Sequence, residues 1–306
     1  MKIYHSTKDL KINNPVLTVG TFDGVHLGHR KILKTLVEHA KAINGEAVVF
    51  TLYPHPRKVL FPETNNLFFL NTIEDKAKLL EEIGIKHFVV YPFTKDFASF
   101  SSCYFIEKIL YNQLNIKQLI VGYDHHFGKD KQGDFEILKK CTSKFNIEIF
   151  KVNAFEQDGV TISSTKIRNE LLYGNVELAN KYLNYKYSIQ GKIISGNKIG
   201  RKIGFPTANI EVDKSKLVPA NGVYAVEVFI SDFQYKGMLN IGTRPTIDNN
   251  SEKNIEVHIF DFQGNVYGCV LKINFLKFIR NEKKFNNIED LRLQLIEDKR
   301  VVEDIF

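Results

Sequence analysis

The chain has 306 residues and a formal net charge of +7, with 43% hydrophobic and 25% charged residues. This length favours two domains, and the composition is that of an ordinary globular protein. No apolar run approaches the roughly 20 residues that a membrane-spanning helix requires. The first ten residues lack the apolar core of a signal peptide, so we expect a cytoplasmic protein that does not associate with membranes.

Charge and cysteine content narrow the possible partners. Basic residues are scattered among acidic ones, without a long basic run or aromatic–basic interleaving. The positive charge therefore predicts nucleotide phosphates, and not nucleic acid, as the anionic partner. The three cysteines, Cys103, Cys141 and Cys269, show no metal-binding spacing, and we expect reduced thiols.

Strand and helix signals alternate up to about residue 152. The apolar runs that predict strands are 16–19, 47–52, 87–91, 118–121 and 148–152. Helical signals cover 26–43, 103–114 and 135–144, and a capping-box-like start at Thr72 opens a further helix that ends at Gly84. This alternation predicts a mostly parallel sheet covered by helices, with ligands at the carboxyl ends of its strands.

The most informative segment follows the first strand and contains Gly20, Phe22, Asp23, Gly24, His26, Gly28 and His29. It leads into a helix whose first turn has unpaired backbone N–H groups and a positive dipole end, which attract phosphate. His26 and His29 share one helix face, and the glycines would let a nucleotide approach the backbone. Two imidazoles and free amides suit displacement at phosphorus. The alternative is a turn whose histidines only cap and solvate the helix.

Further candidate contacts to a nucleotide lie near other strand ends of this domain. His55 stands in a Pro-His-Pro loop, where it could bind phosphate or only decorate a rigid turn. Asp124 follows the fourth strand and could bind ribose or adenine, or be an ordinary turn residue. His125 and His126 are adjacent and have no evident third ligand, which argues against a metal.

A helix start at residues 164–168 is the last candidate of this domain. Ser164 and Thr165 offer hydroxyls and backbone amides, and Arg168 follows one turn later. These groups could form a compact anion site. The alternative is a helix cap with a solvated arginine.

The alternation of strand and helix signals ends after residue 162. Short helices are predicted over 166–173 and 176–183, and we place the domain boundary so that residues 1–183 and 184–306 form the two domains. Strand-like runs at 187–194, 222–230, 234–241, 254–260 and 269–278 predict an antiparallel barrel or sandwich. A terminal helix over 288–297 has an apolar stripe of Ile288, Leu291 and Leu295, which we expect to be core.

A glycine-punctuated loop opens the second domain. Gly191, Gly196 and Gly200 could bring backbone amides to phosphates, although the loop lacks the ending of a Walker A motif. Thr207 and Asn209 would face the same side of an extended backbone, where their oxygens suit Mg²⁺. The alternative is a turn that is hydrogen-bonded by its own side chains.

Glu256 alternates with the apolar Ile255 and Val257 in a predicted strand. A carboxylate that points into a barrel is unfavourable without a partner or a role, so we expect a general base for a substrate hydroxyl. The alternative is an outward, solvated face of the strand. The segments 240–246 and 280–285 could also contact a ligand, but their spacing does not reveal their chemistry.

Together these segments resemble the prokaryotic bifunctional riboflavin kinase/FAD synthetase family nearly from end to end. The resemblance rests on the Gly-x-Phe-Asp-Gly-x-His-x-Gly-His turn, the Pro-His-Pro loop, the Ser-Ser-Thr-x-x-Arg helix start, the Gly-Phe-Pro-Thr-Ala-Asn loop and the Glu-x-His strand. The chain departs from the family in the Gly-x-Asp-x-x-Phe-Gly loop, where His125 replaces a phenylalanine.

The resemblance implies an α/β nucleotidylyltransferase domain with a Rossmann-like parallel sheet, followed by an antiparallel β-barrel riboflavin kinase domain with a terminal helix. The second domain would phosphorylate riboflavin with ATP, giving FMN and ADP. The first, an FMN adenylyltransferase, would transfer AMP from ATP to FMN, giving FAD and pyrophosphate.

The same resemblance implies roles for the candidate residues. His26 and His29 would steady the phosphates of ATP, with help from the helix start at 164–168. Glu256 would take the proton from the 5′-hydroxyl of riboflavin, while Thr207 and Asn209 hold Mg²⁺ with ATP. A contact between Arg280 and the flavin rests on the resemblance alone.

Two other functions stay open at this point. A nucleotidylyltransferase for a different phosphorylated substrate would need no second phosphate-binding loop, so the Pro-Thr-Ala-Asn segment argues against it. A flavin- or RNA-binding regulator without catalysis would not need the candidate catalytic and metal-binding residues of both domains together.

Overall fold

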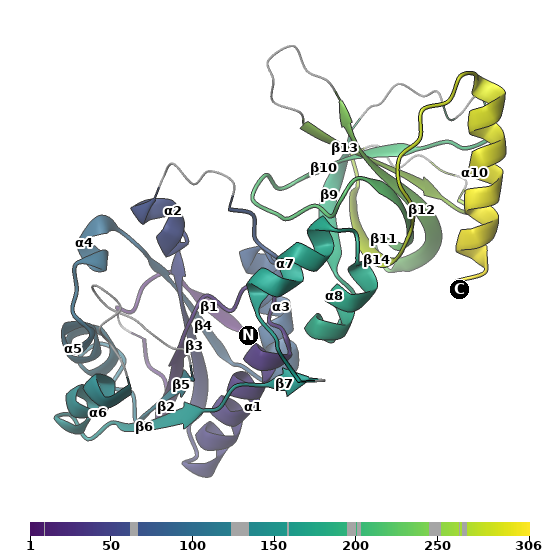
Figure 1. The fold of residues 1–306 in the computed structure, drawn as a ribbon. Coiled ribbons are helices and arrows are strands. Elements are labelled where there is room, and N and C mark those ends of the chain that lie inside the picture. Colours follow the sequence, from purple (N-terminus) through teal and green to yellow (C-terminus); the bar gives the residue numbers. More distant parts are fainter. Residues whose placement is uncertain are drawn as a thin grey trace. The chain divides into compact units, whose positions relative to one another are not determined.

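The computed structural model divides the chain into two compact units, Met1–Ser164 and Thr165–Phe306. It describes residues 1–8, 10–61, 67–123, 135–157, 159–194, 200, 203–244, 252–262, 264 and 268–306. The first unit contains a parallel sheet and the second a closed antiparallel barrel, which confirms the predicted fold class (Figure 1).

The division falls earlier in the chain than the boundary expected between residues 183 and 184. The helices α7 (Ser164–Leu172) and α8 (Val176–Leu183) lie between the two positions. They are tied to the second unit because the N–H of Ala220 donates to the carbonyl of Leu171, and Nδ2 of Asn180 donates to the carbonyl of Phe275.

The sheet of the first unit has the strand order β1-β4-β3-β2-β5-β6. Its strands are β1 (Lys2–Tyr4), β2 (Pro15–Val19), β3 (Glu46–Tyr53), β4 (His87–Pro92), β5 (Gln118–Gly122) and β6 (Glu148–Val152). The predicted strands are all present, and β1 is an additional edge strand. Every residue of β2 and β5 is buried, as expected for parallel strands that are covered on both faces. A short antiparallel pair, β7 (Glu156–Gln157) and β8 (Val160–Thr161), follows the sheet.

Helices cover both faces of this sheet. The helices α1 (Leu27–Ala42) and α3 (Ile73–Ile83) contribute to the apolar cluster on one face. The other face is covered by α5 (Ser102–Phe105), the π-helical segment η1 (Ile106–Tyr111) and α6 (Phe135–Ser143). The capping box at Thr72 and Asp75 and the left-handed Gly84 bound α3 as predicted. Two short helices, α2 (Pro56–Leu60) and α4 (Lys95–Ala98), follow β3 and β4.

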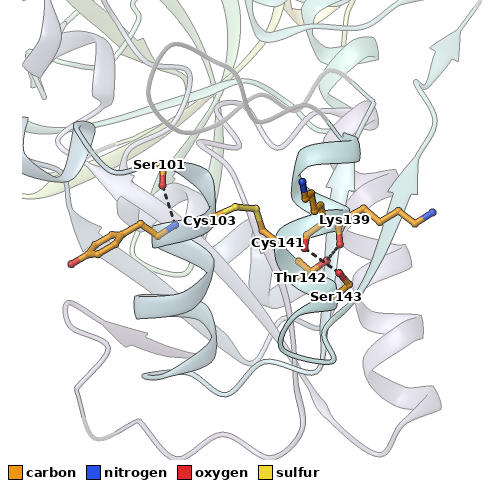
Figure 2. The surroundings of a disulfide bond; sticks show 8 residues. Ser101, Cys103, Lys139, Cys141, Thr142 and Ser143 are labelled. Carbon is orange, nitrogen blue, oxygen red and sulfur yellow. Dashed lines mark hydrogen bonds between the residues drawn. A yellow bond between two sulfur atoms is a disulfide. The ribbon is translucent and has the colours of Figure 1, made fainter.

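A disulfide joins Cys103 in α5 to Cys141 in α6 (Figure 2). The two Cα atoms are 5.2 Å apart, a separation that a disulfide commonly spans. The expectation that these two cysteines are reduced thiols is therefore wrong. Packing of α5 beside α6 brings them together, and no local sequence spacing reveals such a tertiary contact. Cys269 is free and exposed.

The barrel of the second unit has the strand order β10-β13-β12-β11-β14-β9. Its strands are β9 (Ser188–Ile194), β10 (Ala208–Val212), β11 (Gly222–Ile230), β12 (Phe233–Arg244), β13 (Glu252–Ile259) and β14 (Val270–Arg280). The sequence did not predict β10, which is short. Tyr224, Leu239 and Val257 are fully buried cross-strand neighbours that face the interior.

The terminal helix α10 (Ile288–Glu303) lies along the outside of the barrel (Figure 1). Val302 of α10 belongs to one apolar cluster with Ala225 and Met238 of the barrel strands. Leu291 and Leu295 are half-buried, whereas Ile288 is 52% exposed. The expectation of a core stripe is therefore wrong at Ile288, which stands in the first turn of the helix.

Gly191 provides a test of barrel packing. A Cβ at this position would lie 2.3 Å from the carbonyl oxygen of Glu211. Because β9 pairs with a strand on each side, the backbone cannot easily shift to remove this clash. We expect Gly191→Ala to destabilise the second unit by about 3 kcal/mol. Gly268→Ala is the control, because nothing lies within 4 Å of its Cβ and only its positive φ of +79° opposes the change. Thermal denaturation should show a loss of about 1 kcal/mol for the control, and equal losses would contradict the packing role.

Candidate functional site

A cavity of about 410 Å³ lies at the carboxyl ends of the strands in the first unit. Its polar end contains Thr18, Gly20, Thr21 and His29. Most of the remaining wall is apolar and aromatic, and it includes Phe22, Ile32, Leu52, Pro56, Leu60, Phe93, Phe97, Phe100 and Phe105. The cavity thus joins a polar end at the start of α1 to a chamber that suits a flat ring system.

His26 and His29 meet at the first turn of α1. Their rings stack with centroids 3.6 Å apart, and the backbone N–H of His29 donates to Nδ1 of His26 at 3.3 Å. His26 is therefore the N-cap of the helix, so the capping part of the alternative interpretation is correct. Because Nδ1 of His26 accepts this bond, the proton of its neutral ring lies on Nε2, where it can be donated.

His29 is the group with unused hydrogen-bonding capacity at this site. Its Nδ1 is buried and has no hydrogen-bond partner among the described residues. The pKa of its ring lies well below the usual value, first because of burial and then because of nearby His26 and Lys76. A buried polar atom without a partner is unfavourable, so this nitrogen is suited to a ligand.

Asp23 and Lys76 hold the turn that precedes the histidines. The Asp23 carboxylate is 3% exposed and accepts hydrogen bonds from the N–H groups of Leu70 and Asn71. Nζ of Lys76 donates to the carbonyl of Thr21 at 2.5 Å. Burial lowers the pKa of Lys76, while the nearby Asp23 carboxylate opposes this shift. The structure therefore gives the Asp23 side chain a bracing role within the protein.

The glycines of this turn make room mainly for its own aromatic rings. A Cβ at Gly20 would lie 2.8 Å from the ring of Phe22, and one at Gly28 would lie 3.2 Å from the ring of His26. Gly24 has a φ of +88°, a conformation that favours glycine. Gly28 thus makes room for the cap, and the close approach of a nucleotide at this turn stays a prediction.

The other candidates of the first unit lie in different places. His55 is the N-cap of α2, where its Nδ1 accepts from the N–H of Arg57, and it does not line the cavity. Oγ of Ser164 donates to the carbonyl of Asp23 at 2.7 Å and so reaches the histidine turn. Thr165 and Arg168 belong to the second unit. Asp124, like His125 and His126, lies outside the described residues.

A second cavity, of about 300 Å³, lies between the barrel, α10 and the segment that precedes β10. Its polar lining comprises Thr207, Asn240, Glu256, His258, Arg280, Glu282 and Lys283, and its apolar lining includes Ile203, Phe205, Val223, Met238, Phe285, Leu291 and Leu295. Gly200 also lines it, and its carbonyl accepts from the N–H of Phe205. Gly191, by contrast, is paired within β9, and Gly196 lies outside the described residues.

Glu256 stands on the outer face of the barrel. It pairs across strands with Asn209, which pairs in turn with Ile194, a residue that is 43% exposed. Cross-strand partners share one face of a sheet, so Glu256 points away from the interior, and the expectation of an inward side chain is wrong. The solvated alternative does not describe it either, because Glu256 is half-buried and lines the second cavity.

Oxygen-bearing side chains gather around the Glu256 carboxylate. Oγ1 of Thr207 donates to one carboxylate oxygen at 3.4 Å, and Nδ2 of Asn254 donates to the other at 2.7 Å. Asn209 is 4% exposed and is the cross-strand neighbour of Glu256. Asn254 was not predicted as a site residue, although its position two residues before Glu256 places it on the same strand face.

Arg280 lines the same cavity and is held by a buried acid. Its Nε and Nη2 form a two-pronged ion pair with Asp298 of α10, with Nη2 2.6 Å from Oδ2. Asp298 is 2% exposed. Asp298 was not predicted either, but its sequence position carries a signal, because an acid at helical spacing from Leu291 and Leu295 interrupts an apolar stripe.

His258 completes the polar lining of this cavity. Its Nδ1 lies 2.8 Å from the carbonyl oxygen of Pro206, and burial lowers the pKa of its ring. Neutral Nδ1–H donates to that carbonyl. His258 thereby ties β13 to the segment that carries Thr207.

Comparisons with known proteins match both units. A family model described as FAD synthetase matches residues 9–166, and one described as riboflavin kinase matches residues 183–306. The bifunctional riboflavin kinase/FMN adenylyltransferase of Haemophilus influenzae is 38% identical over 95% of this chain and 94% of its own length. The protein of that name from Bacillus subtilis is 37% identical over 93% of this chain and 90% of its own length.

A solved structure also matches the whole chain. The crystal structure of a Streptococcus pneumoniae protein described as a macrolide-efflux protein has a TM-score of 0.91 and 32% identity, over 99% of this chain and 98% of that one. In the parts of this chain that the structure describes, we find no helix with the length and apolar character needed to cross a membrane.

The lowered pKa of His29 leads to a titration experiment. We expect the His29 ring to stay neutral as the pH falls through 6.5, which is the ordinary pKa of a histidine. Burial and nearby positive charge oppose its protonation. The unfolded chain takes up this proton near pH 6.5, so His29 makes the first unit less stable below that pH and has no such effect above it. NMR titration of the imidazole signals should show this, with the His29 signal identified by its loss in His29→Gln. A midpoint at or above 6.5 would contradict the assignment.

Proposed function

This chain belongs to the bifunctional riboflavin kinase/FMN adenylyltransferase family and catalyses both steps of flavin cofactor synthesis, and we propose that each step takes place at one of the two cavities described above. Riboflavin and ATP give FMN and ADP in one step, and FMN and ATP give FAD and pyrophosphate in the other. The observation that carries this proposal is that each cavity has an apolar chamber beside a small set of reactive polar groups.

We assign adenylyl transfer to the cavity of the first unit. In this step a phosphate oxygen of FMN attacks the α-phosphorus of ATP, and the bond from that phosphorus to the bridging oxygen of pyrophosphate breaks. Negative charge grows on the phosphate oxygens during this displacement. The ring nitrogens of the His26–His29 stack, in which His26 is buried and His29 half-buried, can hold these oxygens by hydrogen bonds to charge, which are strong.

The aromatic chamber of this cavity provides the place for the flavin ring of FMN. Phe93, Phe97, Phe100 and Phe105 line it, and flat aromatic surfaces bind such rings by stacking and by burial of apolar area. The FMN phosphate would then lie toward the polar end, near His29.

We assign phosphorylation of riboflavin to the cavity of the second unit. Glu256 takes the proton of the 5′-hydroxyl as its oxygen attacks the γ-phosphorus of ATP, and ADP leaves with the bridging oxygen. The carboxylate is suited to this role because Thr207 and Asn254 fix the positions of its two oxygens. The apolar residues of β11, β12 and α10 in this cavity would cover the flavin ring.

The residues beside Glu256 also fit Mg²⁺. The hydroxyl of Thr207, the amide oxygen of Asn209 and the neighbouring carboxylate are hard oxygen donors of the kind that this ion prefers. When bound with ATP, Mg²⁺ would neutralise charge on the transferred phosphoryl group. Thr207 and Asn209 would hold the ion, as the resemblance implies.

The remaining assignments from the sequence stay predictions. Among these are the phosphate-binding roles of Ser164, Thr165 and Arg168, the nucleotide contact of Asp124 and a cytoplasmic location, where ATP is available for both reactions. The ion pair with Asp298 holds the Arg280 guanidinium at the wall of the second cavity, and this supports the proposed contact with the flavin.

Glu256→Gln should separate the two activities. The amide keeps the shape of the side chain but cannot take the proton, so riboflavin phosphorylation should fall by about 100-fold or more while FMN adenylylation is unchanged. The measurement is chromatographic separation of flavins after incubation with ATP and Mg²⁺, starting from riboflavin or from FMN. Glu211→Gln makes the same change at an exposed site on β10 and should keep both activities. Equal loss of both activities in Glu256→Gln would refute separate sites.

His29→Ala should have the opposite effect. Loss of the imidazole ring removes a contact to the ATP phosphates, so FMN should accumulate from riboflavin and FAD formation should fall by about 100-fold. His5→Ala is the control, because His5 is exposed and lies outside the cavity. Normal FAD output from His29→Ala would remove the proposed role.

A further inference from the structure

The register of the barrel places four polar residues in one row across its outer face. Asn209 of β10 pairs with Glu256 of β13, and Glu256 pairs with Asn240 of β12. Asn240 pairs with Val223 of β11, which pairs with Arg280 of β14. We call Asn209, Glu256, Asn240 and Arg280 the polar row. Its last three members line the second cavity, so this row faces the space where riboflavin would react.

Unlike Asn254 and Arg280, Asn240 makes no side-chain hydrogen bond to the residues that the structure describes. Asn254 uses its amide on Glu256, and Arg280 uses its guanidinium on Asp298. The Asn240 amide is half-buried in the cavity wall and hydrogen-bonds to no residue that the structure describes. A side-chain amide has two donors and an acceptor, so that of Asn240 can hydrogen-bond to a ligand that enters the cavity.

The spacing of the row suggests which ligand group the amide meets. Directly opposed residues of neighbouring strands have Cβ atoms about 4.5–5.5 Å apart, so the Asn240 amide and the Glu256 carboxylate project into the cavity side by side. A hydroxyl that approaches Glu256 brings the next hydroxyl of the same polyol chain within reach of Asn240. An amide suits that second hydroxyl because it can donate and accept without competing for the reacting proton.

We propose that Asn240 binds the ribityl hydroxyl next to the one that is phosphorylated, and so selects a polyol chain and aligns it on Glu256. This inference rests on the proposed role of Glu256 as the base. It assigns the Asn240 amide to the alcohol substrate, whereas Thr207 and Asn209 are assigned to the metal and ATP.

The test compares two enzymes on two substrates. Asn240→Ala should lower kcat/KM for riboflavin by about 10-fold, the usual effect of removing one buried hydrogen bond, while the KM for ATP is unchanged. The second substrate is 4′-deoxyriboflavin, which lacks the neighbouring hydroxyl. The kcat/KM of the wild type should be about 10-fold lower on this analogue than on riboflavin. The kcat/KM of Asn240→Ala should be at most about twofold lower on the analogue than on riboflavin. A merely structural effect of Asn240→Ala would lower kcat/KM by the same factor on both substrates, and that result would overturn the proposal.

Two controls guard against other causes. Asn240→Leu fills nearly the same volume without hydrogen-bonding groups, so it should show the same dependence on the 4′-hydroxyl as Asn240→Ala. Gln190→Ala removes an amide from an exposed position on the outer face of β9 and should leave kcat/KM unchanged on both substrates. FMN adenylylation by each preparation should be unchanged, which shows that the chain has folded.

The two levels of the proposal fail in different ways. If Glu256→Gln keeps full riboflavin kinase activity, the proposed function of this cavity fails and the role of Asn240 fails with it. If Glu256→Gln loses activity but Asn240→Ala performs as well as the wild type on riboflavin, only the role of Asn240 is overturned.

Discussion

Backbone pairing between strands is the constraint on which both sites depend. In the second unit, residues from β10, β12 and β13 that are far apart in the chain become neighbours because each strand pairs in one register. A shift by one residue would turn Glu256 and Asn240 to the other face of the barrel, where Leu239 and Val257 fill the interior. Tight packing of that interior therefore also secures the register of the polar residues outside it.

The parallel sheet of the first unit works in a comparable way. Its strands bring the turns that follow them to one edge, where the start of α1 meets apolar side chains from α2, α4 and α5. The hydrogen bond that caps α1 uses Nδ1 of His26 and holds its ring against that of His29. Helix capping, which elsewhere only stabilises a helix end, here also orients the groups that would contact phosphate.

Both sites contain buried polar groups, but these fall into two kinds. Asp23, Lys76 and Asp298 are satisfied within the protein, and they brace the turn at α1 and the guanidinium of Arg280. His29 and Asn240 keep hydrogen-bonding capacity at a cavity wall. The first kind can be buried because each group has a partner, whereas the second kind is half-buried and keeps atoms to which a ligand can hydrogen-bond. This contrast distinguishes groups that support a site from groups that we propose to contact its ligand.

The sequence by itself determined most of the strands and helices, the class of each unit and the candidate residues near strand ends, because hydrophobic period and turn residues are local signals. It also showed that Glu256 lies between two apolar neighbours. Only the tertiary structure decided which barrel face carries Glu256, that α10 covers this face, and that Cys103 meets Cys141. It also showed that Asp23 braces the turn before α1 and that Gly28 makes room for the ring of His26. Strand register, helix packing and the partner of a buried polar group arise from contacts between distant segments, and no local pattern specifies them.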